Sequence, residues 1–150
     1  MTVLILMRHG AAAMLLPDAD RPLTDDGVAE AAATGAWLRE TGLAPDLALV
    51  SSARRTRETF AATGVDCPAE VLGELYNCEP EDVFAAVNAV CPDAETLLVV
   101  GHFPAIPEVA HLLAPGADVP GFSTGTVAAF TLTPGPIAPG SGTLLDSFSP

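Results

Sequence analysis

The feature that most constrains the fold is a set of short apolar segments, each ending abruptly in polar residues. The clearest is Thr2–Met7 (TVLILM), which is followed at once by Arg-His-Gly. A segment this short that is apolar at every position is typical of a strand buried on both faces, as in a parallel sheet. Further strands are predicted at Asp46–Val50, Glu70–Leu72, Thr96–Val100, Val127–Leu132 and Thr143–Phe148.

Helical patterns separate most of these strands. The expected helices run from an N-cap at Thr24 to Gly42, from a cap at Ser51 or Ser52 to Gly64, from Pro80 to Val90, and around Pro107–Leu113. Strands that alternate with helices indicate an α/β protein, here a three-layer α/β/α sandwich with a mostly parallel central sheet. No helix separates the last two strands, so an antiparallel edge strand is expected.

Composition limits the possible partners. A chain of 150 residues, 49% of them apolar, fits a single domain over residues 1–150. The formal net charge is −13 with only six basic residues, so neither nucleic acid nor an anionic membrane is an expected partner. No apolar stretch reaches 18 residues, and Thr2–Met7 is too short for a secretory signal. We therefore expect a cytoplasmic protein.

The cysteines and carboxylates predict neither a disulfide framework nor a metal site. Cys67, Cys78 and Cys91 are odd in number and form no Cys-x-x-Cys pair, which favours free thiols in a reducing compartment. The carboxylates form no cluster with convincing metal-ligand spacing. We expect no metal and no other cofactor.

Three polar clusters follow predicted strands. Arg8-His9-Gly10 follows the first strand, Ser51–Arg57 the second and Gly101-His102 the fourth. The carboxyl ends of parallel strands meet at one edge of an open sheet, where ligands bind. Four of the six basic residues lie in two of these clusters, namely Arg8, Arg54, Arg55 and Arg57.

Such a site suits an anion, with phosphate favoured. Arginine offers a fork of donors that matches phosphate, and helix N-termini add backbone N–H groups. A neutral imidazole in this pocket can attack phosphorus. A second histidine, if protonated, can stabilise the charge of the group being transferred.

These clusters resemble the motifs of the histidine phosphatase superfamily, which includes phosphoglycerate mutases and acid phosphatases. Met7-Arg8-His9-Gly10 resembles the first motif, Ser51–Thr59 the second and Val99–His102 the third. The short chain and Arg21-Pro22-Leu23-Thr24 are similar to the SixA-type phosphohistidine phosphatases. The resemblance implies a phosphoglycerate mutase-like fold.

The resemblance also implies a role for each matching residue. His9 would be the phosphorylated nucleophile, and Arg8 and Arg55 would bind the phosphoryl oxygens, together with the turn at Gly10. His102 would stabilise the transition state. The proton donor is less defined: Glu74 occupies the Leu-x-Glu position of mutase-like relatives but equally suits a solvated loop carboxylate, and the alternatives are Asp18 and Asp20.

The resemblance implies that the chain hydrolyses a phosphorylated substrate through a phosphohistidine intermediate at His9. Long insertions that would cover the site are absent, which favours a phosphohistidine protein as substrate. One alternative is a small phosphomonoester such as a sugar or nucleotide phosphate. Another, from a different class, is a phosphate-binding module without catalysis.

Overall fold

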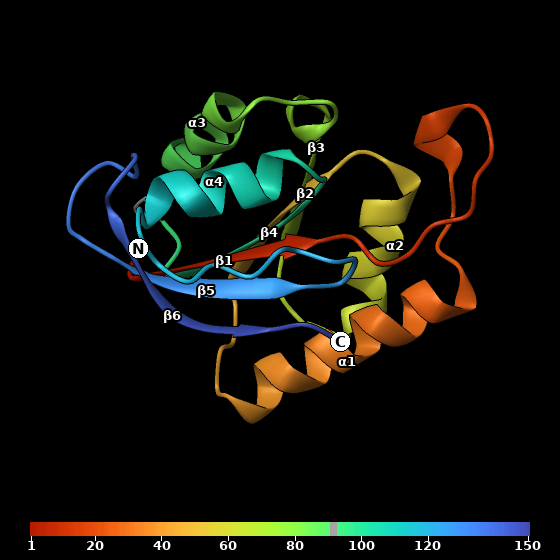
Figure 1. The fold of residues 1–150 in the computed structure, drawn as a ribbon, viewed down its shortest axis with the longest axis horizontal. Coiled ribbons are helices and arrows are strands. Elements are labelled where there is room, and N and C mark those ends of the chain that lie inside the picture. The colour runs from red at the N-terminus through yellow and green to blue at the C-terminus, as the bar shows by residue number, and fades with distance from the viewer. Residues whose placement is uncertain (91–92) are drawn as a thin grey trace.

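The computed structural model describes residues 1–90 and 93–150, and their fold is an α/β/α sandwich (Figure 1). The middle layer is a six-stranded sheet of order β3-β2-β4-β1-β5-β6. Its strands are β1 (Val3–Arg8), β2 (Leu47–Ser51), β3 (Ala69–Leu72), β4 (Thr96–Gly101), β5 (Val127–Leu132) and β6 (Gly142–Phe148). The helices are α1 (Asp25–Glu40), α2 (Arg54–Thr63), α3 (Pro80–Val90) and α4 (Ala105–Leu113), with short 3-10 turns η1 (Asp18–Asp20) and η2 (Gly73–Leu75).

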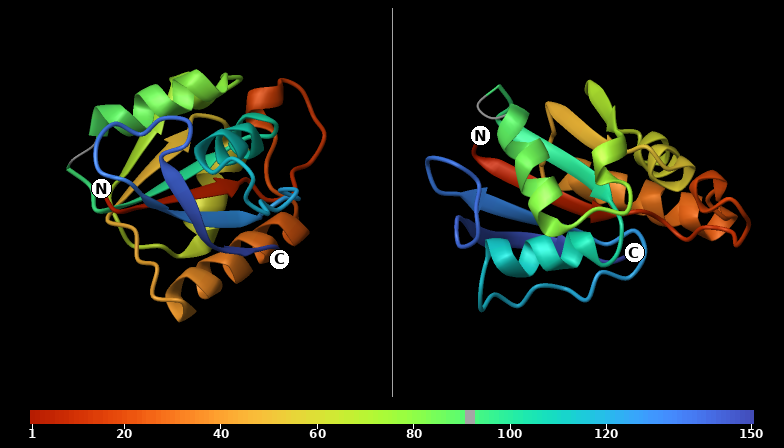
Figure 2. Two further views of the ribbon diagram at one scale, coloured as in Figure 1. Left: turned by 60° about the vertical axis from the view of Figure 1, so that its left-hand side comes forward. Right: turned by 90° about the horizontal axis from the view of Figure 1, so that it is seen from above.

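The sheet is mostly parallel with an antiparallel end. Strands β3, β2, β4 and β1 run parallel, and β5 is antiparallel to both β1 and β6. Helix α1 packs with α2 on one face, while α3 packs with α4 on the other, as the turned views in Figure 2 show. The predicted fold class is therefore confirmed.

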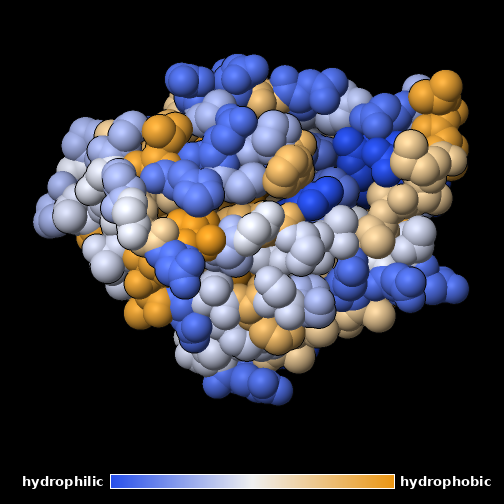
Figure 3. All heavy atoms as spheres, in the orientation of Figure 1, coloured by the Kyte–Doolittle hydropathy of each residue, from blue (hydrophilic) through white to orange (hydrophobic). Residues whose placement is uncertain are grey.

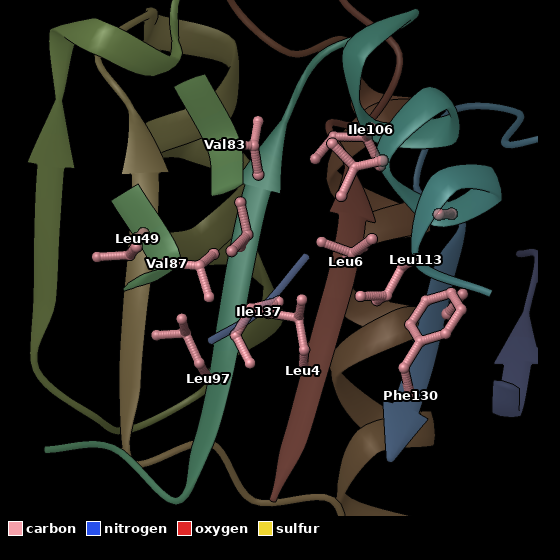
Figure 4. Close-up of a cluster of buried hydrophobic side chains, with 14 of the residues drawn as sticks. Leu4, Leu6, Leu49, Val83, Val87, Leu97, Ile106, Leu113, Phe130 and Ile137 are labelled. Atoms are coloured by element: carbon pink, nitrogen blue, oxygen red, sulfur yellow. The ribbon is translucent and has the colours of Figure 1, made fainter. Parts of the chain in front are cut away.

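The alternation of side chains along β1 explains its apolar sequence. Leu4 and Leu6 belong to the core under α3 and α4, and Ile5 and Met7 belong to the core against α1. All four are fully buried, and Figure 4 shows Leu4 and Leu6 beside Ile106 and other residues of the first core. Full burial of such a side chain is worth about 1.5–3 kcal/mol, so a strand between two helical layers must be apolar throughout.

The helix ends follow local sequence with one exception. Thr24 caps α1, where its Oγ1 accepts a 3.0 Å hydrogen bond from the Gly27 N–H, and Gly64 ends α2 in the left-handed conformation. The predicted cap of α2 at Ser51 or Ser52 is wrong, because the N-cap residue is Ala53. Ser51 instead ends β2, and its hydroxyl points to His102.

Two other expectations concern the cysteines and the membrane. Cys67 and Cys78 are free thiols, and Cys91 lies outside the described residues. Among the described helices, none combines the length and apolar character needed to cross a bilayer.

Candidate active site

The pairing of β1 with β4 brings two histidines together. Arg8 and Gly101 are register partners at the ends of these parallel strands, so the next residues, His9 and His102, leave the sheet side by side. Their ring centroids lie 5.4 Å apart. The predicted convergence of the first and third clusters is therefore observed.

His9 is held in one tautomer. Its Nδ1 lies 2.7 Å from the Gly10 carbonyl oxygen, which can only accept, so Nδ1 carries the proton and Nε2 keeps a free lone pair. The residue is 7% exposed, and burial lowers its pKa from 6.5 to about 4, with the charges of Arg55 and Arg8 adding to the shift. At neutral pH His9 therefore presents an uncharged nucleophilic nitrogen.

Gly10 allows the loop after β1 to approach α1 closely. A Cβ at Gly10 would lie 2.5 Å from the Gly27 carbonyl oxygen, which is closer than real Cβ contacts allow. The Gly10 N–H donates to Thr59 Oγ1 on α2 at 3.0 Å. In this structure Gly10 fixes the position of His9 through packing, and its contact with substrate stays a prediction.

Two arginines flank the histidines. Arg8 Nη1 donates to the Phe122 carbonyl at 2.9 Å, and its guanidinium lies over the Phe103 ring, 5.0 Å from the centroid. Arg55, in the first turn of α2 and 6% exposed, donates from Nη1 and Nη2 to the carbonyl and carboxylate of Asp18. In both arginines Nε is buried and has no hydrogen-bond partner among the described residues.

His102 has one bound and one free ring nitrogen. Its Nε2 lies 2.7 Å from Ser51 Oγ, whereas its Nδ1 is buried without a partner in the described part of the chain. Burial, together with the nearby His9 and Arg55, lowers the pKa of His102 to about 3. The protonated form considered from the sequence is therefore not the resting form at neutral pH.

Asp18 and Tyr76 complete the surroundings of Arg55. Tyr76 donates its hydroxyl proton to Asp18 Oδ2 at 2.6 Å, and its ring meets the His102 ring edge-on with centroids 5.7 Å apart. Hydrogen bonds from Tyr76 and Arg55 lower the pKa of Asp18 to about 2. Asp18 is therefore ionised at neutral pH and does not serve as proton donor.

Sequence reasoning missed Tyr76 and treated Asp18 only as a weak proton-donor candidate. The only sequence signal for Asp18 is its place in the loop that follows His9. Tyr76 carries no such signal, because 58 positions separate it from Asp18 and only the fold brings the two together.

Glu74 lies on the surface of the protein. It sits in η2 with its side chain exposed, and it lines a surface pocket with residues of α3, namely Asp82, Ala85, Ala86 and Ala89. Among the described residues, no hydrogen bond or ion pair connects it with His9 or His102. Its role as proton donor stays a prediction.

The arrangement suits an anion rather than a metal ion. Within the residues that the structure describes, no three His, Cys, Asp or Glu side chains gather closely enough to hold a metal. The three partnerless nitrogens (Arg8 Nε, Arg55 Nε and His102 Nδ1) belong instead to the side chains around His9. Buried polar groups are rarely left unbonded, so such a cluster indicates a ligand that supplies acceptors.

Comparison with known proteins agrees with this chemistry. The model of the histidine phosphatase superfamily (branch 1) matches residues 4–82. An uncharacterised protein of Mycobacterium tuberculosis is 43% identical over 110 residues, which cover 72% of this chain and 70% of that protein. The phosphohistidine phosphatase SixA of Escherichia coli is 33% identical over 135 residues, which cover 85% of this chain and 83% of SixA.

Solved structures extend the similarity to the whole fold. A structure of the protein histidine phosphatase SixA complexed with tungstate superposes with a TM-score of 0.86 at 32% identity and covers 98% of this chain and 96% of that one. The alpha-ribazole phosphatase of Shigella flexneri, at 18% identity and a TM-score of 0.70, shares the fold. The chain belongs to the histidine phosphatase superfamily and is a phosphatase. Within the superfamily it belongs to the SixA-type branch.

Proposed function

We propose that this chain hydrolyses phosphohistidine on a protein through a covalent phosphate on His9 Nε2. The observation that carries the proposal is the pairing of a neutral, tautomer-fixed imidazole with three buried nitrogens that have no partner among residues 1–90 and 93–150. The arginine N–H groups supply fixed positive charge, which the three equatorial oxygens of a transferring phosphoryl group require.

In the first step the phosphate binds between Arg8, Arg55 and His102. The lone pair of His9 Nε2 attacks phosphorus in line, and the leaving group departs with the electron pair of its bond. Nδ1 of His9 keeps its proton and its bond to the Gly10 carbonyl, which stabilises the positive charge that develops on the ring. In the second step water attacks phosphorus, and the electron pair returns to Nε2.

His102 acts in this proposal as a neutral donor. Ser51 Oγ accepts a long hydrogen bond of 3.5 Å from the Ala53 N–H. The Ser51 hydroxyl in turn donates a hydrogen bond to His102 Nε2. The remaining proton of the ring is then on Nδ1, for which the described residues offer no partner. Ser51 thereby fixes the tautomer in which His102 donates to a phosphoryl oxygen.

Three observations support a phosphohistidine protein as substrate. Relatives named SixA phosphohistidine phosphatase match most of the chain. The loop between β1 and α1 exposes Met14 and Leu16, which are 86% and 88% exposed, and Figure 3 shows apolar atoms at the projecting end of this loop. Apolar surface beside a site is typical of contact with another protein. Finally, cleavage of a P–N bond depends less on a strong proton donor than cleavage of a phosphate ester does.

The test compares substrates on the same enzyme. We expect a higher kcat/KM for a protein carrying phosphohistidine than for sugar phosphates, nucleotide phosphates or p-nitrophenyl phosphate. Rapid hydrolysis of sugar phosphates without any loss of phosphohistidine would instead identify a small phosphomonoesterase. The variant His9→Asn, compared with wild type on p-nitrophenyl phosphate, separates catalysis from simple phosphate binding, since equal rates would exclude His9 as nucleophile.

A further inference from the structure

The carboxylate of Asp18 joins three separate segments beside the phosphate site. Arg55 on α2 donates to its Oδ2 at 3.1 Å, Tyr76 after η2 donates to the same oxygen at 2.6 Å, and Arg21 donates to Oδ1 at 3.3 Å. The ring of Tyr76 also contacts the ring of His102. Tyr76 therefore connects the carboxylate of Asp18 with the proposed reaction centre. These contacts fix the position of a negative charge next to Arg55.

This carboxylate retains capacity for another donor. An ionised carboxylate offers about four acceptor positions, and the described contacts use three. The side chain of Asp18 is 44% exposed, whereas that of Arg55 is 7% exposed. The Asp18 side chain is therefore accessible from solvent, while the guanidinium that it holds is buried.

We propose that Asp18 determines specificity for the leaving group by accepting the free N–H of a phosphorylated imidazole. The proposal rests on the proposed function and deepens it. A leaving group that carries an N–H donor or a positive charge is favoured beside a fixed carboxylate, while an anionic leaving group is repelled. The charged groups next to Asp18 are Arg21 and Arg55, and its titratable but neutral neighbours are Tyr76 and His102.

The chemistry of the P–N bond explains why this contact matters. When the far ring nitrogen of the substrate is protonated, the P–N bond can break with its electron pair going to the ring, and neutral imidazole leaves. The proton stays on the far nitrogen throughout, while a new bond forms between His9 Nε2 and phosphorus. By favouring the protonated ring, Asp18 lets the reaction proceed without a proton donor such as Glu74.

The test is the variant Asp18→Asn, assayed with N-phosphoimidazole and with p-nitrophenyl phosphate. Asparagine keeps the size of the side chain and one acceptor oxygen, so Arg55 and Tyr76 retain a partner. We expect the ratio of kcat/KM for phosphoimidazole to that for p-nitrophenyl phosphate to fall at least fivefold. An unchanged ratio, with kcat/KM lowered alike for both substrates, would show that Asp18 only positions Arg55 and would overturn the proposal.

Asp20→Asn is the matched control, because Asp20 lies in the same 3-10 turn. We expect its substrate ratio to equal that of wild type. If Asp18→Asn does not fold, Asp18→Ser is assayed with the same two substrates. The ratio of kcat/KM should again fall at least fivefold, and an unchanged ratio would overturn the proposal.

The outcomes also separate this proposal from the function on which it rests. A wild-type enzyme that hydrolyses p-nitrophenyl phosphate but neither phosphoimidazole nor a phosphohistidine protein would refute the proposed function, and the role of Asp18 with it. An enzyme that is active on phosphoimidazole but keeps its substrate ratio in Asp18→Asn would refute only the role of Asp18.

Discussion

At the scale of single residues, His9 and His102 are both kept neutral by burial next to arginine. Their pKa values of about 4 and about 3 lie below the ordinary 6.5. The positive charge of the site is therefore held by the guanidinium groups of Arg8 and Arg55. In the proposed mechanism this division lets one histidine act as nucleophile and the other as neutral donor at the same pH.

These shifts predict how stability depends on pH. The unfolded chain protonates His9 and His102 as the pH falls below 6.5, but the folded protein does so only near 4 and 3. The unfolded state then binds more protons, so the free energy of unfolding should decrease as the pH falls from 6.5 to 4.5. Denaturant unfolding should show a weaker decrease in His102→Asn than in wild type, and equal slopes would contradict the shift.

The loss of the Ser51 hydroxyl should change kcat more than it changes KM. Ser51→Ala removes the partner of His102 Nε2, and the loss of one such hydrogen bond is worth about 0.5–1.5 kcal/mol. We expect kcat to fall about tenfold with a smaller change in KM. Ser52→Ala, at the exposed neighbouring position, is the control and should keep wild-type kcat. An unchanged kcat in Ser51→Ala would exclude the proposed positioning of His102.

The convergence of His9 and His102 was predictable, because each directly follows a strand, and their catalytic roles stay predictions. Ser51 was expected to cap a helix, because serine after a strand is typical of an N-cap. In the structure the Ser51 hydroxyl instead contacts the imidazole of His102. This contact depends on which strands are neighbours in the sheet. The depressed pKa of His102 was also inaccessible, because it follows from burial.

At the scale of elements, the loop after β1 is pressed against α1 by paired glycines. A Cβ on Gly27 would lie 2.0 Å from the Ala11 carbonyl oxygen, and a Cβ on Gly10 would lie 2.5 Å from the Gly27 carbonyl oxygen. This close contact sets the distance between the His9 turn and α1. Helix-capping by Thr24 was predictable from sequence, whereas this close approach was not, since glycine in the first turn of a helix has several uses.

Gly27→Ala should therefore damage both stability and activity. Alanine would favour a helix by about 1 kcal/mol, but the clash is with backbone that cannot move aside, and overpacking costs about 1–3 kcal/mol. We expect a net loss of stability and a reduced kcat. Gly73→Ala is the control, because its Cβ would meet nothing within 4 Å. Thermal unfolding gives the comparison, and equal midpoints would contradict the packing argument.

At the scale of the whole molecule, a strongly acidic chain concentrates its few cations at one edge of its sheet. The formal net charge is −13, yet Arg8, Arg21 and Arg55 all lower the pKa of His9. The order of strands and helices made it predictable that the polar clusters meet at one edge of the sheet. The path of the loop that carries Asp18 was not predictable, because it depends on contacts with α2 and with the segment after η2.

The most direct test of the account is to trap the phosphoenzyme. Wild-type protein is mixed with a ³²P-labelled phosphohistidine protein, quenched in alkali, where phosphohistidine is stable, and digested for mass spectrometry. We predict one labelled peptide that carries phosphate on His9 and loses it in acid, and no label in His9→Asn. Turnover without a labelled enzyme, or label on a residue other than His9, would contradict the central claim.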